Sequence, residues 1–352
     1  MVRTKMPGGS QIRALILAAG KGRRLRPITQ RLPKALVPIG GAPLIDILID
    51  TYQKAGVASF TVGIGWQGDL LRKHLHKTHS ELNINIVPVP NYEDGPLTTL
   101  VTALKTVEDD CVIVGPVDEI MDRKLVTEAL EDLQDKKLLE DIMLVTDLSV
   151  EKGTEVFLKK DDLVAGLGMP ITEYDFKARS AMLMIISKDA YRRLIESSKS
   201  GMRNLSDALN HLIDNGVQVG SLQVEEHWFD IDTVEDMLQA NQYVLHHMRE
   251  SDDTAILILP GDSMEFGETL TLPGDVFIER GVSLEGPVLI QKNSHIQGNT
   301  QIGPDVVVGK GTRIGAGCII DNAVLFHQAK LNTNMKVQGG VVYGSEILYA
   351  ED

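Results

Sequence analysis

Glycines and basic side chains follow the first apolar stretch of the sequence, in an order suited to phosphate chemistry. Residues 12 to 18 have the pattern of a buried parallel strand, and Gly20 and Gly22 come directly after it. A loop without side-chain bulk lets backbone N–H groups approach phosphate oxygens closely. The basic residues that follow are Arg23, Arg24, Arg26 and Lys34. Because fixed cations can neutralise the charge on a transferring phosphoryl group, we expect phosphoryl transfer at this loop.

The whole stretch from Leu17 to Asp46, LAAGKGRRLRPITQRLPKALVPIGGAPLID, is more specific than either feature alone. A glycine pair by itself is typical of a plain strand–helix connection, and a group of arginines is typical of a solvated surface. Together they resemble the signature of the sugar-phosphate nucleotidyltransferases (NDP-sugar pyrophosphorylases), L-A-A-G-x-G-T-R-L-x-P-L-T followed by P-K-x-L-x-P. The residues in register are Leu17, Ala18, Ala19, Gly20, Gly22, Arg24, Leu25, Pro27, Thr29, Pro33, Lys34, Leu36 and Pro38. Arg23 departs from the pattern, because the family has Thr or Ser there.

The resemblance implies an enzyme that joins a nucleoside triphosphate to a sugar 1-phosphate and releases pyrophosphate. In such an enzyme Arg24 would stabilise the α-phosphate and the departing pyrophosphate, and Lys34 would hold the sugar phosphate and the α-phosphate. The nucleotide-binding residues implied are Leu17, Ala18, Ala19, Gly20, Gly22 and Gly95. Gly95 stands where family members place a segment that touches the base, although a simple turn and helix cap explains it equally well.

The family also implies Mg²⁺ as cofactor, held by two aspartates, since magnesium prefers a few carboxylates with its other positions on water and phosphate. One aspartate lies in a W-x-D-I-G-T segment before a helix, and Trp228 to Thr233 is its counterpart here, with Asp230 as the ligand. The alternative for Asp230 is a helix-capping turn. Asp232 replaces the usual glycine, and would be an extra ligand, an acid behind the ligands, or the sign of a lost constraint.

The other aspartate can be aligned in two ways with the family pattern G-D-x-x-x-D. Matching Gly115 to the family glycine puts Pro116 at the metal position, where it cannot ligate. Matching Asp118 and Asp122 to D-x-x-x-D keeps both acids but replaces the glycine with Val117. We favour Asp118 as the ligand because this alignment preserves the spacing of the acids.

The segments that grip the sugar in many relatives are absent in their usual form. Residues 168 to 173 and 179 to 182 stand where an E-K-P and an N-A/T-G segment would be expected. Gly153 and Glu173 are the remaining candidates for binding the sugar phosphate. The sugar pocket is therefore either specialised for an unusual sugar phosphate or degraded.

These residues require a framework of strands and helices, and the sequence up to residue 250 alternates the two. Strands are predicted over residues 12–18, 59–64, 82–89, 111–114, 141–146, 181–186 and 217–224, and helices over 44–55, 96–107, 190–197 and 234–249. Such alternation predicts an α/β fold with a Rossmann-like, mostly parallel sheet covered by helices on both faces. We assign residues 11–250 to this nucleotidyltransferase domain and residues 251–271 to a linker.

A different periodicity occupies residues 272–352. Every sixth residue is aliphatic at Ile278, Leu284, Ile290, Ile296, Ile302, Val308, Ile314 and Ile320. This is the hexapeptide repeat of a parallel β-helix, and it resembles the left-handed β-helix of the hexapeptide-repeat family. In the nucleotidyltransferases such a domain more often supports homo-oligomers or regulation. Acyltransferase relatives place a catalytic histidine in these coils, which would make His295 or His327 a candidate in a bifunctional enzyme.

The composition argues against several other classes of function. The formal charge of −14 argues against a sequence-independent nucleic-acid binder, and no apolar run approaches a membrane span, so we expect a cytoplasmic protein without nucleic-acid or membrane partners. His74, His76 and His79 are predicted to lie on a solvated helix face rather than in a metal site. Besides the enzyme, Pro116, Asp232 and the missing sugar segments leave open a regulatory subunit that binds nucleotide or sugar phosphate without turnover.

Overall fold

The computed structural model describes residues 12–135, 141–150, 153–202, 204–224, 228–247 and 254–350. These residues form two compact units, each with its own core. The first unit contains the described residues of 12–23, 29–36 and 44–229. The second contains residues 24–28, 37–43 and the described residues from 230 onward. The signature loop and the segment after it therefore contribute to both units.

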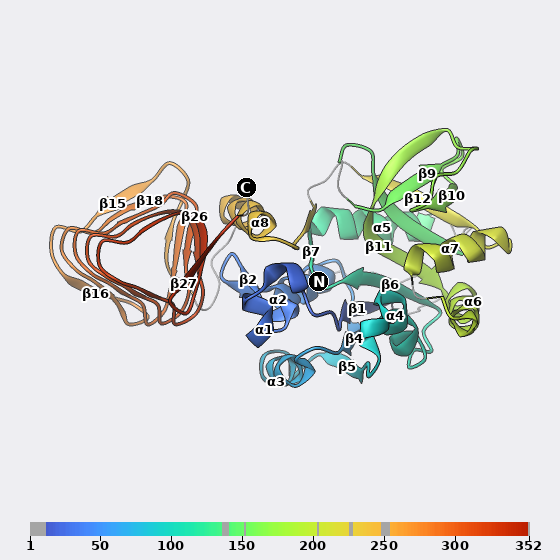
Figure 1. The fold of residues 1–352 in the computed structure, drawn as a ribbon, viewed down its shortest axis with the longest axis horizontal. Helices are drawn as coiled ribbons and strands as arrows, with labels where there is room; N and C mark the ends of the chain where they lie inside the picture. The colour runs from blue at the N-terminus through green and yellow to red at the C-terminus, as the bar shows by residue number, and fades with distance from the viewer. Residues whose placement is uncertain are drawn as a thin grey trace. The chain divides into compact units, whose positions relative to one another are not determined.

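A nine-stranded sheet forms the centre of the first unit (Figure 1). Its strands are β1 (Arg13–Ala18), β4 (Ser59–Ile64), β5 (Asn83–Pro88), β6 (Cys111–Pro116), β8 (Ile142–Asp147), β9 (Glu155–Leu158), β10 (Val164–Leu167), β11 (Phe176–Ser187) and β12 (Val219–Val224). The order across the sheet is β10-β9-β11-β6-β1-β4-β5, and β8 pairs with both β11 and β12. Strands β5, β4, β1 and β6 are parallel, whereas β11 runs antiparallel to β6. The carboxyl ends of β1 and β6 therefore lie at the same edge of the sheet.

Helices cover both faces of this sheet. Buried residues of α2 (Leu44–Lys54), α3 (Gly68–Thr78) and α5 (Arg123–Asp135) join one cluster, and those of α4 (Pro96–Leu104), α6 (Lys188–Ser197) and α7 (Leu205–Asp214) join the other. Strand β1 shows why two clusters form: Ile16 packs in the first and its neighbour Leu15 in the second. Such a strand is buried on both faces, which explains its continuous apolar sequence. The predicted α/β class is confirmed.

Several short elements lie between these strands and helices in the sequence. They are η1 (Arg23–Leu25), α1 (Ile28–Arg31), η2 (Lys34–Leu36), β2 (Pro38–Ile39), β3 (Ala42–Pro43), η3 (Tyr92–Asp94), β7 (Glu119–Met121), η4 (Ser198–Ser200) and β13 (Trp228–Asp230). Predicted and observed bounds agree for β4 and lie within one residue of each other for α2. Helices α5 and α7 and the β9–β10 hairpin were not predicted from the sequence, and α3 was predicted only as a helical stretch around His74, His76 and His79.

A parallel β-helix forms most of the second unit, and Figure 1 shows its stacked coils. Its strands are β17 (Val276–Ile278), β18 (Ser283–Glu285), β19 (Val288–Gln291), β20 (His295–Ile296), β21 (Gln301–Ile302), β22 (Val306–Val308), β23 (Arg313–Ile314), β24 (Ile319–Leu325), β25 (Lys330–Leu331), β26 (Lys336–Tyr343) and β27 (Glu346–Tyr349). All eight aliphatic positions of the predicted period are buried. Ile278 pairs with Ile296 and Ile296 with Ile314, so one coil is three repeats long. The left-handed sense stays a prediction.

The predicted linker over residues 251–271 differs from the structure. Where this stretch is described, it forms β14 (Thr254–Ile258), β15 (Ser263–Glu265) and β16 (Leu270–Leu272). These strands pair antiparallel with β19, β18 and β17, respectively, and so continue the sheets of the β-helix. These strands were not predicted, because they run antiparallel to the coils and lack the six-residue period of the repeat.

Helix α8 (Val234–His247) also belongs to the second unit, although it was assigned to the first domain. It packs against β24 and β26 of the β-helix. The buried amide of Asn241 accepts a hydrogen bond of 3.1 Å from the backbone N–H of Gly40. Gln291 of β19 donates one of 2.9 Å to the carbonyl of Gly41. The β2–β3 hairpin, which follows Lys34 in the signature, is thus held by elements more than two hundred residues away.

The two histidines of the coils have local partners. His295 lies 3.1 Å from a carboxylate oxygen of Glu279 and packs edge-on against Phe277. His327 accepts a hydrogen bond of 3.2 Å through Nδ1 from the backbone N–H of Lys310. Both sets of contacts are between neighbouring coils, which explains these histidines as structural residues. Among the described helices, none is long and apolar enough to cross a membrane.

Candidate active site

A cleft of about 230 Å³ opens in the first unit at the carboxyl ends of β1 and β6. It is lined by seven residues that the sequence analysis named for the site: Leu17, Ala18, Ala19, Gly20, Lys34, Gly95 and Asp118. Tyr92, Pro116 and Met182 also line it. In parallel sheets, ligands bind outside the carboxyl ends of the strands, so the location suits a nucleotide.

The loop after β1 is held by contacts that require Gly22. This glycine has a φ of +55°, and a Cβ there would lie 3.0 Å from Cγ2 of Thr29. The Thr29 hydroxyl donates a hydrogen bond of 2.6 Å to the Gly22 carbonyl. Gly20 is different, because a Cβ on it would meet nothing within 4 Å. Gly22 is therefore required for the conformation of the loop, whereas Gly20 leaves open space at the cleft.

Trp66 and Glu93 hold the same loop from outside the signature. The backbone N–H of Trp66 donates to the carbonyl of Ala19 at 3.0 Å, and its indole Nε1 donates to the carbonyl of Thr29 at 2.8 Å. Lys21 forms an ion pair of 2.6 Å with Glu93. The hydrogen bond and charge of Lys21 hold the pKa of the Glu93 carboxyl below its usual value. The loop is therefore fixed in position within this unit.

Lys34 is buried, and its Nζ donates a hydrogen bond of 2.5 Å to Oδ2 of Asp118. Lys34 comes from η2 and Asp118 from the turn after β6, so the pairing joins two distant parts of the chain at the cleft. Asp118 is partly exposed, with 26% of its side-chain surface accessible. A cation and a carboxylate thus meet at the wall of the cleft.

The neighbours of Asp118 have other roles. Pro116 lines the cleft but offers no side-chain ligand. Gly115 lies against Tyr52, whose hydroxyl would be 2.6 Å from an added Cβ. Asp122 accepts a hydrogen bond of 2.8 Å from the backbone N–H of Lys124 at the start of α5. Gly115 is therefore explained by packing and Asp122 by helix capping.

In the second unit, Arg24 forms an ion pair with Asp232. The Arg24 side chain is 69% exposed, whereas that of Asp232 is 16% exposed. Asp232, which stands where the family has glycine, thus has a partner in the signature arginine. Asp230 is exposed at the end of β13.

The turn after Asp230 is capped by two other residues. The Asp236 carboxylate accepts from the backbone N–H groups of Asp232 and Thr233, at 3.1 and 2.8 Å. The Thr233 hydroxyl accepts in return from the N–H of Asp236 at 3.2 Å. This reciprocal arrangement is a capping box at the start of α8. Because Thr233 and Asp236 cap the helix, the capping explanation for Asp230 is not needed.

Gly95 is the single residue between η3 and α4. Its φ is +110°, and Pro96 occupies the first turn of the helix. Both residues line the cleft, so the N-terminus of α4 opens onto it. A helix N-terminus favours negative charge, which suits a site for phosphates or for the polar edge of a base.

The family follows from a match over much of the first unit. Residues 14–211 match the MobA-like NTP transferase domain, which covers more than half of the chain. The chain belongs to the MobA-like NTP transferase family. Residues 284–347 in addition match the GMPPB C-terminal domain, and this range lies within the β-helix.

The matches to curated relatives cover most of the chain. The chain is 22% identical over 281 residues to the bifunctional protein GlmU of Methanococcus aeolicus, covering 77% of the chain and 61% of GlmU. It is 24% identical over 371 residues to the UTP–glucose-1-phosphate uridylyltransferase of Synechocystis, covering 95% of the chain and 87% of that protein. The chain thus spans about three-fifths of the length of GlmU.

A solved structure shares the fold of the NTP transferase domain. The inositol-1-phosphate CTP transferase from T. maritima superposes with a TM-score of 0.55 at 21% identity, covering 65% of this chain and 92% of that one.

Two candidate residues of the NTP transferase lie away from the cleft-lining set. Gly153 is exposed, with a φ of +102°, and its carbonyl accepts a hydrogen bond of 3.2 Å from Arg179. Glu173 is exposed in the connection between β10 and β11. Neither residue lines the cleft that contains Lys34. The structure therefore does not bring them together with the signature residues.

Met182 was missed by the sequence analysis, and its conformation is unusual. Its φ is +52°, a region that side-chain-bearing residues rarely adopt, and the pairing of β11 shifts register between Ser180 and Met184. Met182 lines the main cleft and also a neighbouring cavity, whose apolar wall includes Leu144 and Leu205. The residue type does not reveal this conformation, because a positive φ is ordinarily adopted by glycine and only rarely by methionine.

Proposed function

We propose that this protein joins a nucleoside triphosphate and a sugar 1-phosphate to give an NDP-sugar and pyrophosphate. The phosphate oxygen of the sugar would attack the α-phosphorus in line, while the bond between the α-phosphorus and the bridging oxygen to the β-phosphate breaks. Pyrophosphate then leaves, and no covalent intermediate with the protein is needed. The contribution of the protein is to position two anions and to neutralise their charge.

The observation that carries this proposal is the contact between Lys34 and Asp118 in a cleft lined by Leu17 to Gly20. A buried lysine is costly unless its charge has a use or a partner. Asp118 partners Lys34 in the protein alone, and phosphate oxygens would replace or join that carboxylate when substrates bind. Lys34 would then hold the sugar phosphate and the α-phosphate at the same time.

Arg24 would stabilise the α-phosphate and the departing pyrophosphate. Its side chain is largely exposed and is paired with Asp232 before substrate binds. Substrate phosphates would compete with Asp232 for this cation. The nucleotide would lie along residues 17–20, with Gly95 and the N-terminus of α4 beside the base.

Enzymes of this family use a divalent metal, and we propose Mg²⁺ held by Asp118 and Asp230. Carboxylates are the donors that magnesium prefers, and both side chains are accessible to solvent, as a metal that keeps several waters requires. When bound, Mg²⁺ would neutralise phosphate charge. The Asp122 carboxylate caps α5, and this contact favours Asp118 over Asp122 as the metal ligand.

The decisive experiment is a pyrophosphate-release screen of the purified chain with Mg²⁺. Each common nucleoside triphosphate is crossed with a panel of sugar 1-phosphates, and release is followed with a coupled assay. We expect release that depends on one nucleotide and one sugar together, and the NDP-sugar is then identified by mass spectrometry. Silence across the panel despite measurable nucleotide binding would contradict the proposal.

That negative result would favour a regulatory subunit that binds without turnover. The specific observation behind this second candidate is Asp232, which occupies the position of a family glycine and engages Arg24. The variant Asp232→Gly separates the two functions: it releases Arg24 and would restore turnover in a degraded enzyme, but it would not increase turnover in an active one.

We further propose that the β-helix supports a homo-oligomer. The apolar side chains of Leu259 and Ile319 are 50% and 41% exposed on this unit, which leaves surface for a second copy of the chain. Analytical ultracentrifugation of the wild type and of an Ile319→Glu variant tests this. A monomeric wild type would contradict the proposal.

A further inference from the structure

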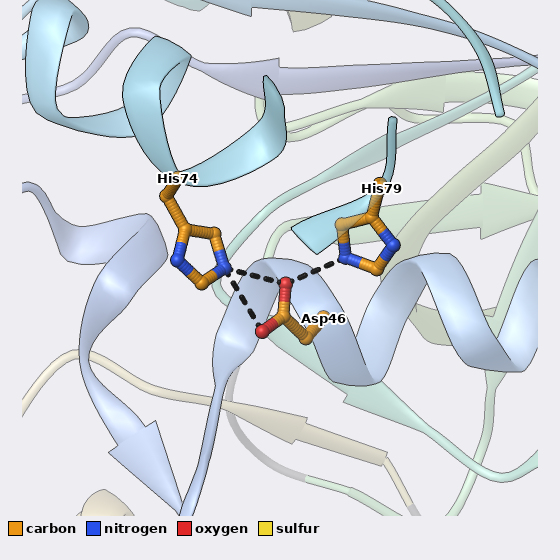
Figure 2. Close-up of side chains that lie close together, drawn as sticks. All are labelled: Asp46, His74 and His79. Atoms are coloured by element: carbon orange, nitrogen blue, oxygen red, sulfur yellow. Dashed lines mark hydrogen bonds and ion pairs between the residues drawn. The ribbon is translucent and has the colours of Figure 1, made fainter. Parts of the chain in front are cut away.

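Two histidines and an aspartate converge on one another in the first unit, outside the cleft (Figure 2). Nε2 of His74 lies 2.8 and 2.9 Å from the two carboxylate oxygens of Asp46. Nε2 of His79 lies 2.7 Å from Oδ1 of the same carboxylate. One ligand atom from each residue can be chosen so that all three lie within 4.8 Å of one another.

Two helices that are apart in the sequence are needed to form this cluster. Asp46 lies in the first turn of α2, His74 lies in α3, and His79 is the residue that ends α3. The backbone N–H of His79 donates to the carbonyl of Leu75 at 2.9 Å, which fixes the residue just beyond the last helical turn. Buried Leu71 and Leu75 hold α3 against the sheet in the same core as α2.

His76 shows that this is not a property of every histidine in the segment. It lies between the other two in sequence, and its side chain is exposed. The sequence predicts all three histidines on a solvated face. That expectation is correct for His76 and wrong for His74 and His79, whose side chains are 22% and 14% exposed and turn toward Asp46.

The carboxylate is kept ionised although it is partly buried. Burial alone would raise the pKa of the Asp46 carboxyl, but hydrogen bonds and charge from His74 and His79 hold this pKa below its usual value. The first turn of α2 also favours a negative charge, and the last turn of α3 favours a positive one. The cluster therefore places a carboxylate and two imidazole rings within reach of a single ion.

We propose that Asp46, His74 and His79 bind one Zn²⁺ ion, with water as the fourth ligand. Two imidazoles and a carboxylate form a donor set that suits a first-row divalent cation, and zinc accepts three protein ligands plus one water. Ligand atoms in a tetrahedral zinc site with bonds of about 2.0–2.1 Å are roughly 3.3 Å apart. The nitrogen–oxygen distances here would open by about half an ångström, and any longer separation, up to 4.8 Å among the three ligand atoms, would close toward the same value.

The hydrogen bonds seen without a metal use the same atoms that zinc would occupy. Each Nε2 now donates a proton to Asp46, and zinc would take the place of these protons between the same nitrogens and oxygen. The three side chains are partly exposed, so an ion and its water can reach them. The ion would connect the start of α2 to the end of α3 and so stabilise this part of the unit.

The test is zinc titration of the full chain after treatment with a chelator, in excess Mg²⁺ so that sites selective for magnesium are filled. The variants are His74→Gln and His79→Gln, with His76→Gln as the matched control on the same helix. We expect wild type and His76→Gln to bind one more equivalent of Zn²⁺ than the other two variants, or to bind it at least about a hundredfold more tightly. Circular dichroism checks that every variant is folded.

Two further measurements do not depend on the variants. Zn²⁺ should raise the unfolding midpoint of the wild type by roughly 5 °C at a hundredfold excess over its dissociation constant. Anomalous scattering at the zinc edge should place the ion among the three side chains. Equal zinc binding by folded wild type and His79→Gln, no zinc binding at all, or an anomalous peak elsewhere would each overturn the proposal.

Discussion

Lys34 brings a positive charge to a buried position, and its ammonium lies 2.5 Å from Asp118. A lysine in such a place contributes more electrostatic stabilisation to a developing charge than it could in water. Lys34→Met removes the charge but keeps most of the length and apolar volume of the side chain. We expect kcat to fall by about 10²–10³-fold or more, with the fold retained, as measured by pyrophosphate release and circular dichroism.

The control for this variant is Lys54→Met. Lys54 is exposed at the end of α2 and pairs only with Asp50, one helical turn earlier, among the contacts of the described chain. Its replacement should leave kcat unchanged. Near-normal turnover by folded Lys34→Met would remove Lys34 from the mechanism.

Gly20 and Gly22 look equivalent in the signature but differ in the structure. An alanine at position 22 would adopt a left-handed conformation and press on Thr29 and Lys34, at 3.0 and 3.3 Å. We expect Gly22→Ala to destabilise the protein by about 1–2 kcal/mol in urea unfolding and to reduce kcat. Gly20→Ala should leave stability unchanged and raise the KM for the nucleotide, because its new methyl group points into open space at the cleft. The same stability loss in both variants would contradict this distinction.

At the residue scale, the sequence indicates which residues lie together where they belong to one continuous segment. Residues 17–20 and Lys34 are near one another in the chain, and the structure places them in one cleft. The pairing of Asp46 with His79 depends on how α2 and α3 pack, and no spacing in the sequence reports it. The positive φ of Met182 is similarly a result of the strand pairing around it, which overrides the preference of the residue.

Helix α8 begins with a capping box, and its energy can be measured. Asp236 accepts hydrogen bonds from the backbone N–H groups of Asp232 and Thr233 and from the Thr233 hydroxyl. Asp236→Ala leaves these donors without their acceptor and should lower the free energy of unfolding by about 1–2 kcal/mol. Glu235→Ala, one residue earlier and exposed, is the matched control and should change it by less than about 0.5 kcal/mol. Equal effects in urea unfolding would show that the box contributes nothing specific.

At the element scale, periodic segments were predicted and segments that depend on their neighbours were not. Strand β4 is buried on both sides and is bounded by turn residues, so its composition alone identifies it. The repeat was predicted because burial recurs every six residues, as at Ile296 and Ile302. Strand β14 has no such period, since it pairs antiparallel with the edge of the β-helix. Its sequence was therefore assigned to a linker.

At the scale of the whole molecule, each unit contains one buried cysteine in its core. Cys111 lies in the first unit at the start of β6, and Cys318 lies in the coils of the second. Burial raises the pKa of the Cys111 thiol to about 12 and also raises the pKa of Cys318. Each thiol is therefore protonated at neutral pH in the folded state and reports on the unit around it.

Alkylation of Cys318→Ala, in which only Cys111 remains, should show how the first unit opens. At pH 8 the raised pKa leaves about a thousandfold less thiolate than a thiol of ordinary pKa near 9, so native labelling should be at least that much slower than labelling in urea. Because the folded thiol releases its proton only near pH 12, native labelling through the folded state should keep rising about tenfold per pH unit beyond pH 9. Labelling of the unfolded chain should instead level off above that pH. A native rate that levels off in the same way would show that Cys111 reacts only after the strand around it opens, and the ratio of the two rates would then give the free energy of that opening.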